Sequence, residues 1–137
     1  MEIIKRLSAF FREKKDVRAA YLFGSHARGD TGPLSDIDVA ILLDKRLSGK
    51  ERFRIQLKII SDVTEILGTD KVDVVVLNDA SLLLKHNAIK EGVVLAESET
   101  ERVAFEVRIM QEYRDMKYYF DLHAKKALSR IAEGGLA

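Results

Sequence analysis

The 137-residue chain contains no cysteine, so it has neither a disulfide framework nor a thiolate metal site. Its longest apolar runs fall far short of the roughly 20 residues that cross a bilayer, and residues 1–16 lack the continuous apolar core of a signal peptide. The net charge of +1 argues against bulk nucleic acid as a partner. We therefore expect one soluble, cytoplasmic domain without membrane contact or direct nucleic-acid binding.

Helical and extended patterns alternate along the chain. Apolar residues recur at helical spacing over 2–15, 51–67 and 79–90, and Gly68 supplies a stop. Strand patterns cover 17–23, 36–43, 71–78 and a shorter, peripheral segment, 92–96. The only proline lies in a loop, "TGPLS". The alternation predicts an α/β (α+β) fold, in which helices flank a small mixed sheet.

A long helix is predicted after this core. Ser98 and Glu101 fit a capping box that opens a helix to about residue 131. Such a helix is about 50 Å long and has apolar residues on more than one side. Either it bends and packs entirely on its own core or it forms a protein interface, and we expect the interface. The domain is thus divided into a core, 1–97, and a helical extension of the same domain, 98–137.

Two acidic residues, Asp36 and Asp38, stand at the head of the apolar strand "DIDVAILL". Side chains two apart on a strand point the same way, roughly 7 Å apart along the backbone. Asp73 enters the next strong strand, "KVDVVVL", in a similar position. If these strands are neighbours, three carboxylates gather and repel one another unless a cation neutralises them. Mg²⁺, a hard cation that takes oxygen ligands and phosphate, answers this requirement.

The preceding loop has the composition of a phosphate cradle. Gly24 and Ser25 follow a strand and precede a predicted tight turn and short helix, where backbone N–H groups bind anions. Arg28, one turn further on, can add charge-assisted hydrogen bonds to phosphate. We also assign Ser35, directly before Asp36, to the nucleotide-binding residues. Cradle and carboxylates together predict a nucleoside triphosphate held with Mg²⁺.

Plainer interpretations exist for several of these polar residues. Gly24 fits a simple turn, Ser35 and Asp36 fit loop and cap positions, and Arg28 and His26 fit a solvated surface. These interpretations leave Asp38, inside the strand, unexplained. Three further aspartates are expected to serve turns, loops or caps: Asp44, Asp70 and Asp79.

The stretch "GSHARGDTGPLSDIDVAI" resembles the signature of the polymerase-beta-type nucleotidyltransferase superfamily: Gly-Ser, ten residues, then Asp-x-Asp. Asp73 on a later strand matches its third carboxylate. The sequence pattern "GS-x-ARG…SDIDVA" is most similar to that of the small prokaryotic minimal nucleotidyltransferases (MNT). The similarity covers 18–96 and, more loosely, the rest of the chain, including the long helix.

This resemblance implies a nucleotidyltransferase fold, ATP as substrate and two Mg²⁺ ions. It implies that Asp36 and Asp38 bind both ions, and that Asp73 completes the site of the ion that activates the acceptor hydroxyl. Asp73 is also the expected acceptor of that hydroxyl's proton. Gly24 and Ser25 are expected to hold the β- and γ-phosphates, so that the α-phosphorus is open to attack.

The resemblance also implies a partner. MNT proteins are antitoxins paired with a HEPN-domain ribonuclease toxin, and they transfer AMP from ATP to a tyrosine of it. We expect the same activity here, in a hetero-oligomer whose contact is made by the C-terminal helix. The neighbouring reading frame is expected to encode a small all-helical protein with an Arg-x4-His motif. The alternatives are an antitoxin that masks its partner without catalysis and a small-molecule, antibiotic-type nucleotidyltransferase.

Overall fold

The computed structural model describes residues 2–24 and 36–134, which form one four-stranded mixed sheet with helices on both faces. The strands are β1 (Val17–Phe23), β2 (Ile37–Leu43), β3 (Val72–Val76) and β4 (Val93–Glu97), in the order β3-β2-β1-β4. β1 runs antiparallel to β2 and to β4, whereas β2 and β3 are parallel. This arrangement confirms the predicted mixed sheet and the peripheral position of β4.

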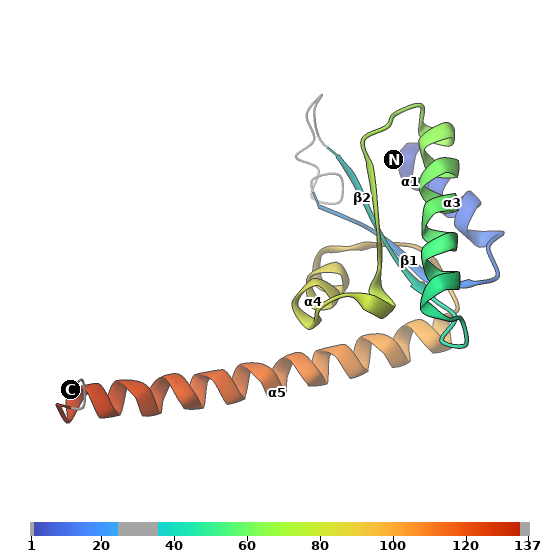
Figure 1. Ribbon diagram of the computed structural model, residues 1–137. Coiled ribbons are helices and arrows are strands. Elements are labelled where there is room, and N and C mark those ends of the chain that lie inside the picture. Colours follow the sequence, from blue (N-terminus) through green and yellow to red (C-terminus); the bar gives the residue numbers. More distant parts are fainter. Residues whose placement is uncertain (1, 25–35, 135–137) are drawn as a thin grey trace.

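Two helices cover each face of the sheet (Figure 1). α1 (Glu2–Arg12) and α3 (Gly49–Leu67) lie on one face, and α4 (Leu82–Glu91) and α5 (Glu99–Ala132) lie on the other. A short 3-10 helix, η1 (Leu77–Asp79), follows β3. α3 provides the crossover that parallel pairing of β2 with β3 requires.

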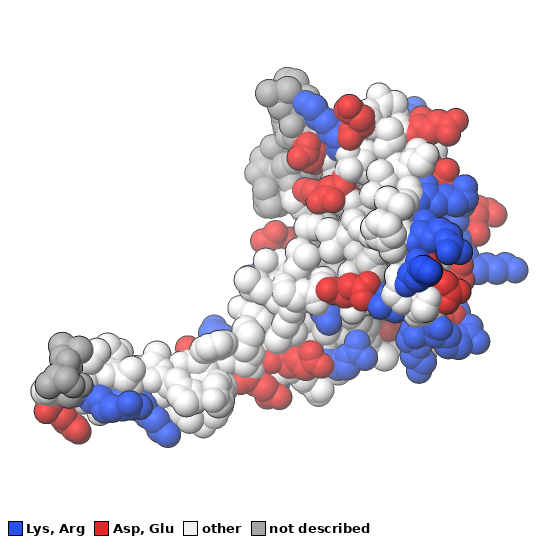
Figure 2. Space-filling view, viewed as in Figure 1, with Lys and Arg blue, Asp and Glu red and all other residues white. Residues whose placement is uncertain are grey.

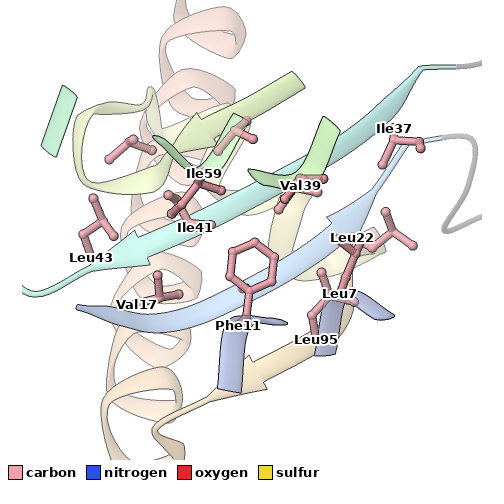
Figure 3. Close-up of a cluster of buried hydrophobic side chains, with 14 residues drawn as sticks. Leu7, Phe11, Val17, Leu22, Ile37, Val39, Ile41, Leu43, Ile59 and Leu95 are labelled. Carbon is pink, nitrogen blue, oxygen red and sulfur yellow. The ribbon is translucent and has the colours of Figure 1, made fainter. Parts of the chain in front are cut away.

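The larger core lies between the sheet and the pair α1 and α3. Figure 3 shows aliphatic side chains of alternate strand positions closing around Phe11 of α1. The residues buried there include Leu7, Phe11, Leu22, Val39, Ile41, Leu43, Ile59 and Leu95. Because strand side chains alternate between faces, this core takes one half of each strand's residues and leaves the other half for α4 and α5.

The second face uses small strand residues. Ala19 and Ala40 are fully buried there, so that Phe105 and Ile109 of α5 pack closely on the sheet. By strand register, Asp38 shares this face with Ala40, because the two are separated by one residue. The acidic end of β2 therefore continues the surface that α4 and α5 cover further along.

Side chains fix several element ends at positions that differ from the predicted ones. α3 begins at Gly49 because Ser48 and Glu51 form a complete capping box. The strand predicted over 71–78 ends at Val76, since Asn78 turns its amide to the backbone N–H and C=O of Leu43. α4 starts at Leu82, later than predicted, because Ser81 caps it through the backbone N–H of Leu84.

The capping box predicted at Ser98 is wrong. Its backbone N–H donates to the Arg18 carbonyl oxygen at 2.8 Å, which continues the pairing of β4 with β1. Glu101 therefore has no N-cap donor to accept from, and its Oε2 lies 3.4 Å from Arg18 Nε instead. The Ser98 side chain makes no capping hydrogen bond either. The helix itself spans 34 residues, as the sequence predicts.

α5 leaves the body of the protein as a straight arm (Figure 1). Its first half contributes the buried Phe105 and Ile109, but every described residue from Lys117 onward is exposed. The interpretation in which this helix bends and packs entirely on its own core is therefore wrong. Among the helices of the described residues, none has the length and apolarity that a membrane span requires.

Candidate functional site

The end of β1 touches the acidic end of β2. Gly24 directly follows β1 and has a φ of 75°, in the left-handed region that favours glycine. A Cβ built on Gly24 overlaps Asp38 Oδ2 and lies 3.3 Å from Asp38 Cγ. The close approach of the Gly24 backbone to this carboxylate therefore requires glycine at position 24.

Two of the predicted carboxylates lie on neighbouring parallel strands, and the third, Asp36, directly precedes β2. Asp38 of β2 is paired with Asp73 of β3 in the strand register, and Phe23 of β1 is its partner on the other side. Paired strands lie about 4.8 Å apart, and paired residues point to the same face. Asp36 lies two residues before Asp38, directly before the start of β2. The expectation that these strands are neighbours is confirmed.

The carboxylates differ in exposure. Asp38 is half-buried, while Asp36 and Asp73 are exposed. Within 2–24 and 36–134, no three acidic or histidine side chains are gathered closely enough to hold a metal ion. The register thus makes the carboxylates neighbours without converging them on one point. As donors they fit Mg²⁺, which binds carboxylate oxygens and keeps open positions for phosphate.

Several predicted residues lie outside the described part of the chain. These are Ser25, Arg28 and Ser35, together with His26 and the turn and short helix expected after Gly24. Their assignment to nucleotide binding stays a prediction. Only Gly24 of the predicted phosphate cradle is described, and it lies against Asp38.

A buried polar group links β1 to α5, and the sequence analysis did not find it. The Tyr21 hydroxyl, in a residue that is 1% exposed, donates to Glu106 Oε2 at 2.7 Å. Arg102 Nη1 donates to the same oxygen at 2.7 Å. Burial and the adjacent Glu106 carboxylate raise the pKa of Tyr21. The spacing of Arg102 and Glu106, one helical turn, is the only signal of this group in the sequence.

Asp44, expected to be a simple turn residue, is buried at the opposite end of β2. Its Oδ2 lies 2.7 Å from Nη2 of both Arg18 and Arg46. Hydrogen bonds from the Arg46 side chain and backbone, and then from Arg18, hold the pKa of Asp44 well below its usual range. A cavity of about 450 Å³ beside it is also lined by Glu101 and Arg108. This cavity adjoins the far end of the strand from Asp38, so it is not the candidate site.

Asp79, also expected in a loop or cap, lies in η1. Its two carboxylate oxygens accept from Arg52 Nε at 3.0 Å and Nη2 at 2.7 Å. This bidentate pair ties the end of β3 to α3 and lowers the pKa of Asp79.

The mixed sheet brings a left-handed glycine against a strand-borne carboxylate and places a second carboxylate in register beside it, a donor set suited to a divalent cation and phosphate. Residues 5–101 match the family described as Polymerase beta, Nucleotidyltransferase. That span contains Gly24, Asp36, Asp38 and Asp73. The chain belongs to this nucleotidyltransferase family.

The chain is also similar in sequence to individual proteins of known activity. The chain is 31% identical over 97 residues to protein adenylyltransferase MntA of Shewanella oneidensis. The match covers 71% of this chain and 66% of that protein, so it spans just under two thirds of the relative's length.

Solved structures share the fold. The chain resembles a chain of a toxin–antitoxin complex with AMP-PNP, with a TM-score of 0.68 at 23% identity, over 93% of this chain and 99% of that one. It also resembles a chain of the complex of tri-AMPylated Shewanella oneidensis HEPN toxin with MNT antitoxin, with a TM-score of 0.63 at 21% identity. That second match covers 93% of this chain and 99% of the other.

Proposed function

We propose that this chain is an antitoxin that transfers AMP from ATP to a tyrosine hydroxyl of a HEPN ribonuclease toxin. The observation that carries the proposal is the register of Asp38 with Asp73 beside Gly24, in a chain of the nucleotidyltransferase family. Support for the acceptor comes from the adenylyltransferase name of the Shewanella relative and from the AMPylated HEPN toxin in a complex of the same fold.

Asp36, Asp38 and Asp73 are the residues that would hold Mg²⁺, as two ions. Mg²⁺, when bound, neutralises phosphate charge and activates the acceptor hydroxyl. Asp38 and Asp73 on neighbouring strands, with Asp36 directly before β2, supply the oxygen ligands that such ions take.

The chain's own groups have separate tasks in the transfer. Gly24 lets the backbone approach the β- and γ-phosphates, and Ser25, Arg28 and Ser35 would donate hydrogen bonds to the nucleotide. Asp73 is exposed and is the residue that would accept the proton of the tyrosine hydroxyl. The tyrosine oxygen forms a bond to the α-phosphorus, and the bond from that phosphorus to the bridging oxygen breaks and releases pyrophosphate.

The test uses the product of the adjacent reading frame, the expected all-helical protein with an Arg-x4-His motif. Incubated with ATP, Mg²⁺ and wild-type chain, this protein should gain the mass of one or more AMP units on a tyrosine. Incubated with the Asp73→Asn variant, the partner should gain no AMP, although it should still bind the variant chain. Asp70→Asn, an exposed aspartate three positions earlier, is the matched control and should transfer normally.

Equal neutralisation of the partner by wild type and Asp73→Asn, with no added mass in either case, would show masking without catalysis. A neighbouring reading frame whose product lacks the Arg-x4-His motif would contradict the proposal that the partner is a HEPN toxin. Transfer to an aminoglycoside but not to the partner would support the small-molecule activity instead.

A further inference from the structure

The exposed half of α5 carries large apolar side chains that nothing within the described chain covers. Figure 2 shows this half extending from the body as a narrow arm. Its exposed apolar residues are Tyr118, Tyr119, Phe120, Leu122, Leu128 and Ile131. These residues lie on more than one side of the helix, and Phe120 and Ile131 share the side that continues the packed face of α5. Exposed apolar side chains that continue a packed face mark an interaction surface.

One face of α5 continues from the body onto the arm. On the body this face buries Phe105 and Ile109 and partly buries Tyr113 and Met116. Because positions three and four apart lie on one side of a helix, the same face continues beyond Met116. Its residues there are Phe120, His123, Ala124, Ala127 and Ile131, which we call the α5 seam.

The α5 seam has packed aromatic rings at its N-terminal end and small alanine side chains further along. The Tyr119 ring, beside the seam, lies 6.2 Å from the Phe120 ring and 4.2 Å from the His123 ring, measured between centroids. Beyond them Ala124 and Ala127 leave the helix backbone open to close approach. Residues 116–131 extend about 24 Å, the length of four to five helical turns, which is enough for a partner helix to lie along them.

The net positive charge of the exposed half of α5 indicates what kind of surface it can bind. Residues 117–131 contain four basic side chains and one acidic one: Lys117, Lys125, Lys126 and Arg130 against Asp121. Two copies of this arm packed side by side would bring eight basic residues together against two acidic ones, which is repulsive. An acidic surface is therefore the complement of this arm, and a second copy is not.

We infer that the α5 seam docks an acidic, helical face of the toxin, with Phe120 as the central anchor. The inference rests on the proposed function for the identity of the partner, and it adds which face of which helix makes the contact. An apolar seam flanked by basic residues receives a helix whose own apolar stripe is flanked by acidic ones.

Two neighbouring aromatic residues provide a matched test. Phe120, 61% exposed, lies on the seam, while Tyr118, 71% exposed, lies on the opposite side of the helix. Binding of the Arg-x4-His protein is measured by titration calorimetry, with circular dichroism to verify helix content. We expect Phe120→Glu to weaken binding at least 100-fold and Tyr118→Glu to change it less than threefold. Similar affinities for the two variants would overturn the assignment.

Transfer measurements separate this inference from the proposed function. At partner concentrations above the weakened Kd, Phe120→Glu should still transfer AMP, because the arm is remote from Asp38 and Asp73. Asp73→Asn should bind normally and transfer nothing. If Phe120→Glu binds the partner normally and still transfers AMP, the α5 seam is not the docking surface, whereas the proposed transfer activity is unaffected.

Light scattering of the chain alone tests the other occupants. We expect a monomer for wild type and for Phe120→Glu. A wild-type dimer that Phe120→Glu dissociates would assign the seam to a second copy and overturn the inference. Binding of a transfer RNA that the same substitution abolishes would overturn it in favour of nucleic acid.

Discussion

Asp38 and Asp73 are direct partners across the parallel strands β2 and β3, although α3 separates them in the sequence. Their pairing depends on the crossover that returns the chain parallel to β2, and it places like charges on adjacent strands. Under the proposed function, Mg²⁺ would bind this pair of carboxylates and balance their charge. The strand register of Asp38 with Asp73 is therefore the feature on which the proposed Mg²⁺ site rests.

Asp38→Asn should abolish AMP transfer by several orders of magnitude while leaving the fold intact, because the amide keeps the shape and removes the charge. Circular dichroism should show an unchanged helix content, which separates loss of chemistry from loss of fold. Chelation of Mg²⁺ should stop transfer by the wild type. Asp70→Asn is the control, and transfer by Asp38→Asn at its rate would remove Asp38 from the site.

Gly24→Ala should destabilise the chain by about 1–3 kcal/mol and impair transfer, because the left-handed backbone is strained and the added methyl overlaps Asp38. Gly68→Ala is a matched control, with a φ of 67° and no atom within 4 Å of an added Cβ. Urea unfolding of both variants separates the strain from the overlap. A cost at Gly24 no greater than at Gly68 would contradict the close approach to Asp38.

Tyr21→Phe should lower the free energy of unfolding by about 1.5–3 kcal/mol, since the half-buried Glu106 carboxylate loses a hydrogen-bond donor. Arg102 stays beside Glu106, so the network is weakened rather than removed. Denaturant titration measures the loss. Tyr118→Phe, at an exposed ring, should change stability by less than about 0.5 kcal/mol. An equal effect of the two changes would show that the Tyr21 hydroxyl contributes nothing.

Acid should weaken the wild type through Asp44. Hydrogen bonds from Arg46 and Arg18 depress the pKa of Asp44 in the folded state, so its stabilising contribution is complete above the unfolded pKa of about 3.9. That contribution is lost as the pH falls through the lower folded pKa. Asp44→Asn should therefore be less stable than wild type at pH 7 and should show a shallower fall in unfolding free energy below about pH 4. Parallel pH profiles would contradict this role.

The sheet and its acidic end were predictable because they rest on local patterns. Apolar runs with period two mark the strands, and a carboxylate inside such a run, as at Asp38, stands out against its neighbours. Contacts between distant segments left no such pattern. Asp44 looks like any turn residue until Arg18 is folded against it, and Tyr21 looks like any core aromatic until Glu106 reaches its hydroxyl.

Two Ser-x-x-Glu patterns show where local reasoning ends. At Ser48 the pattern forms a complete capping box, because Glu51 accepts the free N–H of the cap residue. At Ser98 the same N–H is already bonded to Arg18 of β1. Both stretches have the same Ser-x-x-Glu pattern. They differ in whether the serine N–H is available to the glutamate or is already bonded to a neighbouring strand. Helix α5 was thus predicted correctly in length and incorrectly in how it starts.

The change from a packed to an unpacked α5 divides one continuous helix into two regions of unequal local stability. Helices without tertiary contacts are marginal in water, so the arm beyond Met116 opens far more often than the part around Ile109. Its amide protons should exchange with deuterium quickly, and a protease should cleave there first. A bound partner would slow both processes. The lifetime of the intact chain in a cell would then depend on how much of that partner is present.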